Sequence, residues 1–172
     1  MHQLHLLRHA KSSWDDDADD HARPLNRRGR ESARAIGESL PKVVSGFDLV
    51  LCSSALRTRE TAELVLAGFK PAPKILFEDA LYLASQTALM QRLLEVGEDF
   101  DTVLVIGHNP GLHELAMALA TPDSIGFSTL VNGKFPTGVR CRFVIGTDWS
   151  QIDSTRHRLV DYVTAKSLGA DD

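Results

Sequence analysis

Short apolar runs alternate with longer segments whose apolar residues recur at helical spacing. An apolar run of four to eight residues between polar residues is typical of a strand buried on both faces, as in parallel sheets. Such runs occupy residues 3–8, 48–52, 74–77, 102–106 and 139–145. In the last run, Arg140 and Arg142 alternate with apolar residues, which indicates an edge strand with one wet face.

Helical patterns follow most of these strands. Four begin near a residue that favours a helix N-terminus, and we expect the N-caps to be Asn26, Ser54, Ser85 and Asn109. A short helix is expected over residues 158–166, and residues 121–138 form a predicted loop rich in Gly, Pro and Ser. Alternating strands and helices predict one three-layer α/β/α sandwich with a mostly parallel central sheet, covering residues 1–172 as a single domain.

Composition and charge limit the partners and the cellular compartment that we expect for this protein. A chain of 172 residues with 43% hydrophobic residues can bury a sizeable core. The net charge of −4 gives no reason to expect nucleic acid or an anionic membrane as partner. The two cysteines, Cys52 and Cys141, lie in apolar strand-like runs, which favours buried, reduced thiols. Without a span or signal-peptide pattern, we expect a cytoplasmic protein.

Polar residues gather where three of the predicted strands end. Arg8 and His9 end the first strand, Arg57 lies in the helical turn beyond the second, and His108 follows the strand over 102–106. The carboxyl ends of parallel strands meet at one edge of the sheet, where ligands of open α/β sheets bind. Arginines bind phosphate oxygens through two donors, and a helix N-terminus near Asn109 favours anions. The spacing therefore predicts a phosphate pocket.

Two loop segments lie near this predicted pocket. Residues 14–21, WDDDADDH, are too charged to pack and are expected to form an exposed loop at its mouth. Arg23 follows in the loop before the first helix, so its side chain can point at a ligand.

Four motifs occur in order along nearly the whole chain: LLRHAKSSW, RPLNRRG, LCSSALRTRETA and VIGHNPGLHELA. Together they resemble the histidine phosphatase superfamily, the phosphoglycerate-mutase-like enzymes. The usual Arg-His-Gly appears here as Arg8-His9-Ala10, a change that removes no catalytic side chain. The short chain is similar to the SixA-type branch of small phosphohistidine phosphatases.

The resemblance implies roles for these residues. His9 would be the nucleophile that forms a phosphohistidine intermediate, and Arg8, Arg57 and His108 would hold the phosphoryl oxygens. Asn109 and Arg23 are further candidates for substrate binding. No metal or other cofactor is expected, because arginines supply the positive charge.

A general acid is hard to find in the sequence. Larger members of the superfamily use a glutamate to protonate an alcohol leaving group, but the stretch after the third strand lacks that pattern, leaving Glu78 or Asp79 as weak candidates. Such an absence favours phosphohistidine, whose imidazole departs easily, carried on a protein.

Other functions stay open at this point. The chain could be a phosphatase of a small phosphate monoester, or a non-catalytic phosphate-binding module. A metal-dependent hydrolase has less support, since no metal-ligand motif such as His-Glu-x-x-His is present.

Overall fold

The computed structural model describes residues 1–15 and 17–170, and its centre is a six-stranded sheet in the order β3-β2-β4-β1-β5-β6. The four strands β3, β2, β4 and β1 are parallel, whereas β5 and β6 continue the sheet in antiparallel pairing. The predicted mostly parallel sheet is therefore confirmed. The strands are β1 (His2–Arg8), β2 (Leu49–Ser53), β3 (Ile75–Glu78), β4 (Thr102–Gly107), β5 (Arg140–Ile145) and β6 (Arg158–Val163).

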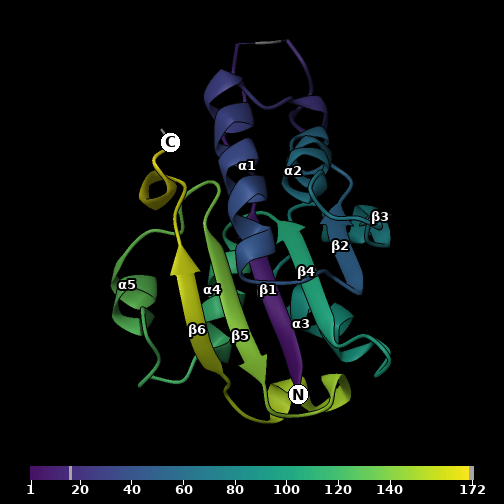
Figure 1. The fold of residues 1–172 in the computed structure, drawn as a ribbon, viewed down its shortest axis with the longest axis vertical. Helices are drawn as coiled ribbons and strands as arrows, with labels where there is room; N and C mark the ends of the chain where they lie inside the picture. Colours follow the sequence, from purple (N-terminus) through teal and green to yellow (C-terminus); the bar gives the residue numbers. More distant parts are fainter. Residues whose placement is uncertain (16, 171–172) are drawn as a thin grey trace.

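Helices cover both faces of this sheet, as Figure 1 shows. One face carries α1 (Arg27–Ser39) and α2 (Leu56–Leu66), while the other carries α3 (Gln86–Leu94) and α4 (Gly111–Leu119). Leu4 and Leu6 of β1 pack into the core beneath α3 and α4, and Leu7 packs into the core beneath α1 and α2. Side chains of a strand alternate between faces, so β1 must be apolar on both.

The C-terminal third differs from its predicted structure. Residues 158–163 form the edge strand β6 and not a helix, and β5, expected at the edge, lies between β1 and β6. The segment RLVDYV is rich in β-branched and aromatic residues, and pairing with β5 satisfies backbone groups that a helix would leave exposed on β5. The expected loop over 121–138 contains a short helix, α5 (Phe127–Asn132).

Two of the four predicted N-caps are confirmed. The side chains of Asn26 and Ser85 accept hydrogen bonds from the backbone N–H groups of Gly29 (2.8 Å) and Ala88 (3.1 Å). The predictions for Ser54 and Asn109 are wrong: α2 and α4 begin after Ala55 and Pro110, without a side-chain cap. Both polar side chains bond elsewhere in the fold.

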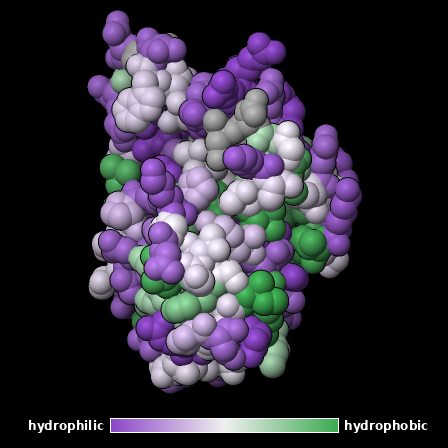
Figure 2. Space-filling model, turned by 90° about the vertical axis from the view of Figure 1, so that its left-hand side faces the viewer, coloured by the Kyte–Doolittle hydropathy of each residue, from purple (hydrophilic) through white to green (hydrophobic). Residues whose placement is uncertain are grey.

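The surface that carries α5 and β6 is mixed. In Figure 2 its apolar side chains form small separate patches, and the upper part of this face is predominantly hydrophilic. Within the described part of the chain, no helix combines the length and apolar character needed to span a membrane.

Candidate active site

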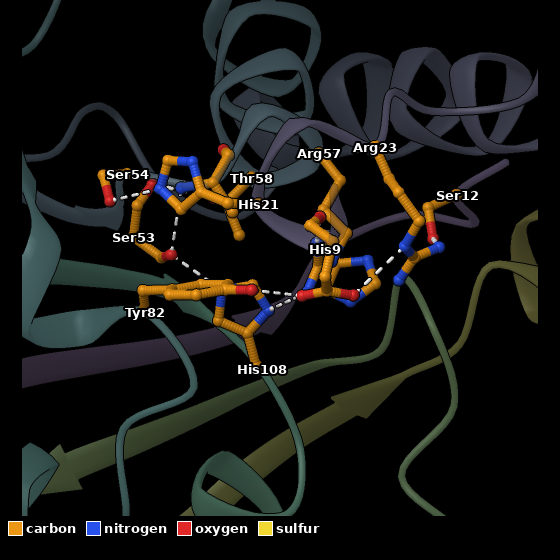
Figure 3. Close-up of polar contacts among 12 residues, drawn as sticks. His9, Ser12, His21, Arg23, Ser53, Ser54, Arg57, Thr58, Tyr82 and His108 are labelled. Atoms are coloured by element: carbon orange, nitrogen blue, oxygen red, sulfur yellow. Dashed lines mark hydrogen bonds and ion pairs between the residues drawn. The ribbon is translucent and has the colours of Figure 1, made fainter. Parts of the chain in front are cut away.

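A cavity of about 370 Å³ opens at the carboxyl edge of the parallel strands. All six residues predicted to form the site line this cavity, although they come from four separate segments of the chain: Arg8, His9, Arg23, Arg57, His108 and Asn109. Figure 3 shows the side chains of His9, Arg57 and His108 converging on one place. The remaining lining residues are Lys11, Ser12, Trp14, Asp20, Leu83 and Thr137.

His9 is fixed by the backbone that follows it. Its Nδ1 lies 2.7 Å from the carbonyl oxygen of Ala10, so Nδ1–H donates to that oxygen and Nε2 carries the lone pair. Ala10 is fully buried, and its N–H donates to Thr61 Oγ1 at 3.1 Å. Burial lowers the pKa of His9 to about 3, despite the bond to Ala10, and the nearby His108 and arginines add to this effect. The imidazole is therefore neutral at physiological pH.

Arg8 and Asn109 share a backbone acceptor on the same wall of the cavity. Arg8 Nη1 donates to the carbonyl oxygen of Phe135 at 2.9 Å, and Asn109 Nδ2 donates to the same oxygen at 2.8 Å. Asn109 does not cap α4, because the helix begins after Pro110 and Asn109 lies one residue before that position. Its Oδ1 is buried and has no hydrogen-bond partner among the described residues, which leaves an acceptor for a ligand.

Arg57 and His108 contact each other on the cavity floor. Arg57 is only 2% exposed, and its Nη2 donates to His108 Nδ1 at 3.4 Å. This contact leaves the proton on Nε2 of His108, and Nε2–H donates to Ser53 Oγ at 2.7 Å. Burial, reinforced by the charge of Arg57, lowers the pKa of His108 to about 3.

Asp20 is a residue of the cavity that sequence reasoning missed. Its carboxylate accepts hydrogen bonds from Arg23 Nε (3.1 Å), from Arg57 Nη2 (3.2 Å) and from the hydroxyl of Tyr82. These contacts, with that of Tyr82 first, lower the pKa of Asp20 to about 2. Nothing in the run of acidic residues distinguishes Asp20 from its neighbours, because its role depends on where the loop folds.

Arg23 also lies in the cavity, where it is only 7% exposed. Its guanidinium donates to Ser12 Oγ at 2.7 Å and to the carbonyl oxygen of Ser13 at 3.1 Å, in addition to its bond to Asp20. The predicted loop is thereby tied to the segment after β1, and Trp14 and Asp20 from that loop reach the mouth of the cavity. Residue 16 of the loop lies outside the described residues.

The two candidate acids after β3 do not line the cavity. Glu78, the last residue of β3, forms a two-pronged ion pair with Arg92 of α3 at 2.8 and 3.0 Å. Asp79 is exposed at the start of a short 3-10 turn over Asp79–Leu81. Asp20 is the carboxylate that the described residues place in the cavity, and it is ionised at neutral pH.

Comparison with known proteins identifies the class to which this α/β fold belongs, a superfamily of phosphatases. Residues 4–81 match the model of the histidine phosphatase superfamily, branch 1. An uncharacterized protein of Mycobacterium tuberculosis is 31% identical over 158 residues, which cover 91% of this chain and 98% of that protein. The chain belongs to the histidine phosphatase superfamily.

Solved structures narrow the comparison within that superfamily. A candidate phosphohistidine phosphatase, SixA from Nakamurella multipartitia, has a TM-score of 0.82 at 26% identity, over 94% of this chain and 95% of that one. A candidate phosphohistidine phosphatase SixA from Agrobacterium tumefaciens has a TM-score of 0.80 at 25% identity, over 95% and 97% of the two chains. The fold is that of small, SixA-like members of the superfamily.

Proposed function

We propose that this protein is a metal-independent phosphohistidine phosphatase that works through a phosphorylated His9. The observation that carries the proposal is the state of His9: a neutral imidazole whose Nδ1–H is held by the Ala10 carbonyl and whose Nε2 is the unprotonated nitrogen. A nucleophilic imidazole needs a lone pair and a fixed ring orientation, and this arrangement supplies both. Without such a nucleophile, the same cavity would only bind phosphate.

The cations of the cavity would hold the phosphoryl group during transfer. Arg8 and Arg57 are positioned before substrate arrives, which suits a reaction that depends on placement and charge stabilisation. His108 has no proton on Nδ1 in this structure. A bound phosphoryl dianion would raise the pKa of His108, so Nδ1 would gain a proton and donate to a phosphoryl oxygen.

In the first step, His9 Nε2 bonds to phosphorus and the bond from phosphorus to the substrate nitrogen breaks. The departing imidazole needs no acid from the protein when its other ring nitrogen is already protonated, because it then leaves as neutral imidazole. In the second step, water attacks phosphorus, the bond to His9 Nε2 breaks, and phosphate and a free imidazole result. The proton of water goes to phosphate or solvent.

The absence of a neutral acid in the described cavity supports a nitrogen-linked substrate. Asp20, with a pKa of about 2, holds no proton to give at neutral pH, and Glu78 is paired with Arg92. An alkoxide is a far stronger base than neutral imidazole and therefore a poorer leaving group, so it needs a proton donor that imidazole does not. Hydrolysis of alkyl phosphates should therefore be slow.

The proposal is tested with free phosphohistidine and a panel of sugar phosphates, using wild type, His9→Ala and His9→Asn. We expect turnover of phosphohistidine by wild type and a loss of at least 10³-fold in both variants. Quenching in denaturant at alkaline pH should trap phosphate on wild type alone, and acid should then release it, as expected for a phosphorylated imidazole. Equal turnover in wild type and variants would refute the nucleophile, and activity confined to sugar phosphates would refute the substrate class. Phosphate binding without turnover would identify a binding module.

A further inference from the structure

Two large apolar side chains stand at the mouth of the cationic cavity. Trp14 is 77% exposed and Leu83 is 53% exposed, whereas His9 on the cavity floor is 6% exposed. Phosphate recognition uses the charged floor and gains nothing from exposed apolar groups on the rim. Exposed apolar surface beside a functional cavity commonly marks a place where another molecule binds.

The side chain of Trp14 is held in place by Arg23. Its indole ring lies 3.5 Å from the guanidinium carbon of Arg23, a cation-π contact. Arg23 is itself held by Ser12, by the Ser13 carbonyl and by Asp20. The contact covers one face of the indole and leaves most of the side chain open to a partner. A rigid aromatic side chain loses little conformational entropy when it binds, as is usual for interface hot spots.

Leu83 is held outward by a strained backbone. It is the one non-glycine residue with positive φ among the described residues, at 50°. A left-handed conformation is unfavourable for a residue with a Cβ, and an exposed leucine does not offset this strain by burial. The neighbouring loop is firmly packed, since a Cβ built on Gly111 would lie 2.0 Å from the carbonyl oxygen of Ala84. Strain of this kind occurs where function requires a side chain in a fixed place.

Charge on the rim further restricts the partner. The loop that carries Trp14 also carries exposed Asp15, Asp17 and Asp19. Of the acidic residues of this loop, Asp20 lines the cavity together with Trp14, so acidic groups close to a bound substrate would meet a carboxylate there, although the arginines of the cavity attract phosphate. The rim therefore complements a segment that is apolar around its phosphorylated residue and free of neighbouring acidic side chains.

We propose that Trp14 and Leu83 form an apolar clamp for a protein segment in which apolar side chains flank the phosphohistidine. This inference rests on the proposed function. The phosphorylated imidazole enters the cavity toward His9, and the flanking side chains of the segment pack on Trp14 and Leu83 outside it. In this proposal, Trp14 and Leu83 at the rim of the cavity select the protein partner, and His9 at its floor carries out the reaction.

The test uses two synthetic phosphohistidine peptides of equal length, one with leucines and one with serines around the phosphohistidine, together with free phosphohistidine. Wild type should favour the leucine peptide by about tenfold in kcat/KM. Trp14→Ala and Leu83→Asn should remove this preference, and Trp14→Phe should retain it. Asparagine adopts the left-handed conformation readily, so Leu83→Asn removes the apolar contact while keeping the backbone. Ile125→Ala, at a residue 75% exposed between α4 and α5, is the matched control.

Trp14→Ala and Leu83→Asn should lose more activity on the leucine peptide than on free phosphohistidine, and Ile125→Ala should match wild type on both. Equal use of both peptides by wild type would overturn the clamp, as would a preference that survives in Trp14→Ala and Leu83→Asn. A parallel loss on 4-nitrophenyl phosphate and free phosphohistidine would show that the rim holds a small ring, which also overturns it. Failure of wild type to hydrolyse any phosphohistidine compound would refute the proposed function and the clamp with it.

Discussion

Three buried histidines should make this protein sensitive to mild acid. His5, His9 and His108 each have a pKa of about 3, and in each of them burial is the largest cause. Secondary causes differ: His5 lies beside Arg140 on the sheet, while the arginines of the cavity act on His9 and His108. An unfolded histidine titrates near pH 6.5. Between pH 6.5 and 3 the unfolded chain therefore binds up to three protons that the folded chain does not bind.

The sign and size of the effect follow from this difference. Stability is fully present above pH 6.5 and falls as the pH drops toward 3, because protons are bound preferentially by the unfolded state. At pH 5.0 each histidine lowers the free energy of unfolding by about 2 kcal/mol relative to pH 7.5, and the three together by about 6 kcal/mol. Carboxylates add little in this window, since unfolded Asp and Glu titrate near pH 4.

Urea denaturation at pH 7.5 and 5.0, at one ionic strength, measures this difference. Substituting His5 by leucine should reduce the pH difference by about 2 kcal/mol, whatever it does to stability at pH 7.5. Leu119→Ala, at a residue 1% exposed in α4, controls for destabilisation without loss of a histidine and should keep the full difference. A wild-type difference below about 2 kcal/mol would refute the assignment of neutral buried imidazoles.

Four further outcomes are expected. Ser53→Ala removes the acceptor of His108 Nε2 and should lower kcat/KM for phosphohistidine by about tenfold; an unchanged value would show that Ser53 does not position the ring. Asp20→Asn removes a negative charge from the cavity and should lower the inhibition constant for inorganic phosphate about tenfold, whereas a higher constant would mean that Asp20 chiefly orients the arginines. Gly111→Ala places a Cβ 2.0 Å from the Ala84 carbonyl oxygen and should lower the free energy of unfolding by about 2 kcal/mol or more. An unchanged midpoint in urea denaturation would contradict this. EDTA should leave turnover unchanged, since side-chain cations supply the charge; a loss restored by a divalent metal would contradict this.

The sequence predicted correctly the positions of those residues whose location depends only on the order and direction of the strands. Arg8 and His9 end β1, and His108 follows β4, which pairs with β1 in parallel register from Gln3–Thr102 to Arg8–Gly107. Once the strands are known to be parallel, these side chains must meet at one edge. The same logic placed Arg57, because it lies in the first turn after β2. Their orientations needed the structure, since the Ala10 carbonyl and Ser53 act through local geometry.

The sequence-based predictions were wrong for segments whose structure depends on contacts with residues far away in the chain. Residues 158–163 satisfy weak helical and strand patterns alike, and the unpaired edge of β5 determines that they become β6. Asn109 is a good N-cap by residue type, but α4 begins one residue later, after Pro110, and the Asn109 amide donates to the Phe135 carbonyl, 26 residues further along the chain. Sequence periodicity contains no information about such long-range acceptors.

Asp20 shows how a loop residue changes the charge of the cavity that forms at the strand ends. The strand ends alone define a strongly cationic cavity that would bind phosphate, the product, as well as substrate. Asp20 reaches Arg57 and Arg23 from the loop and neutralises part of that charge before substrate binds. A bound phosphoryl group must compete with this carboxylate for Arg57, which weakens the hold on free phosphate and favours its release. In the proposed function, the strand ends would supply the chemistry of phosphoryl transfer, and the loops would adjust the affinity for phosphate.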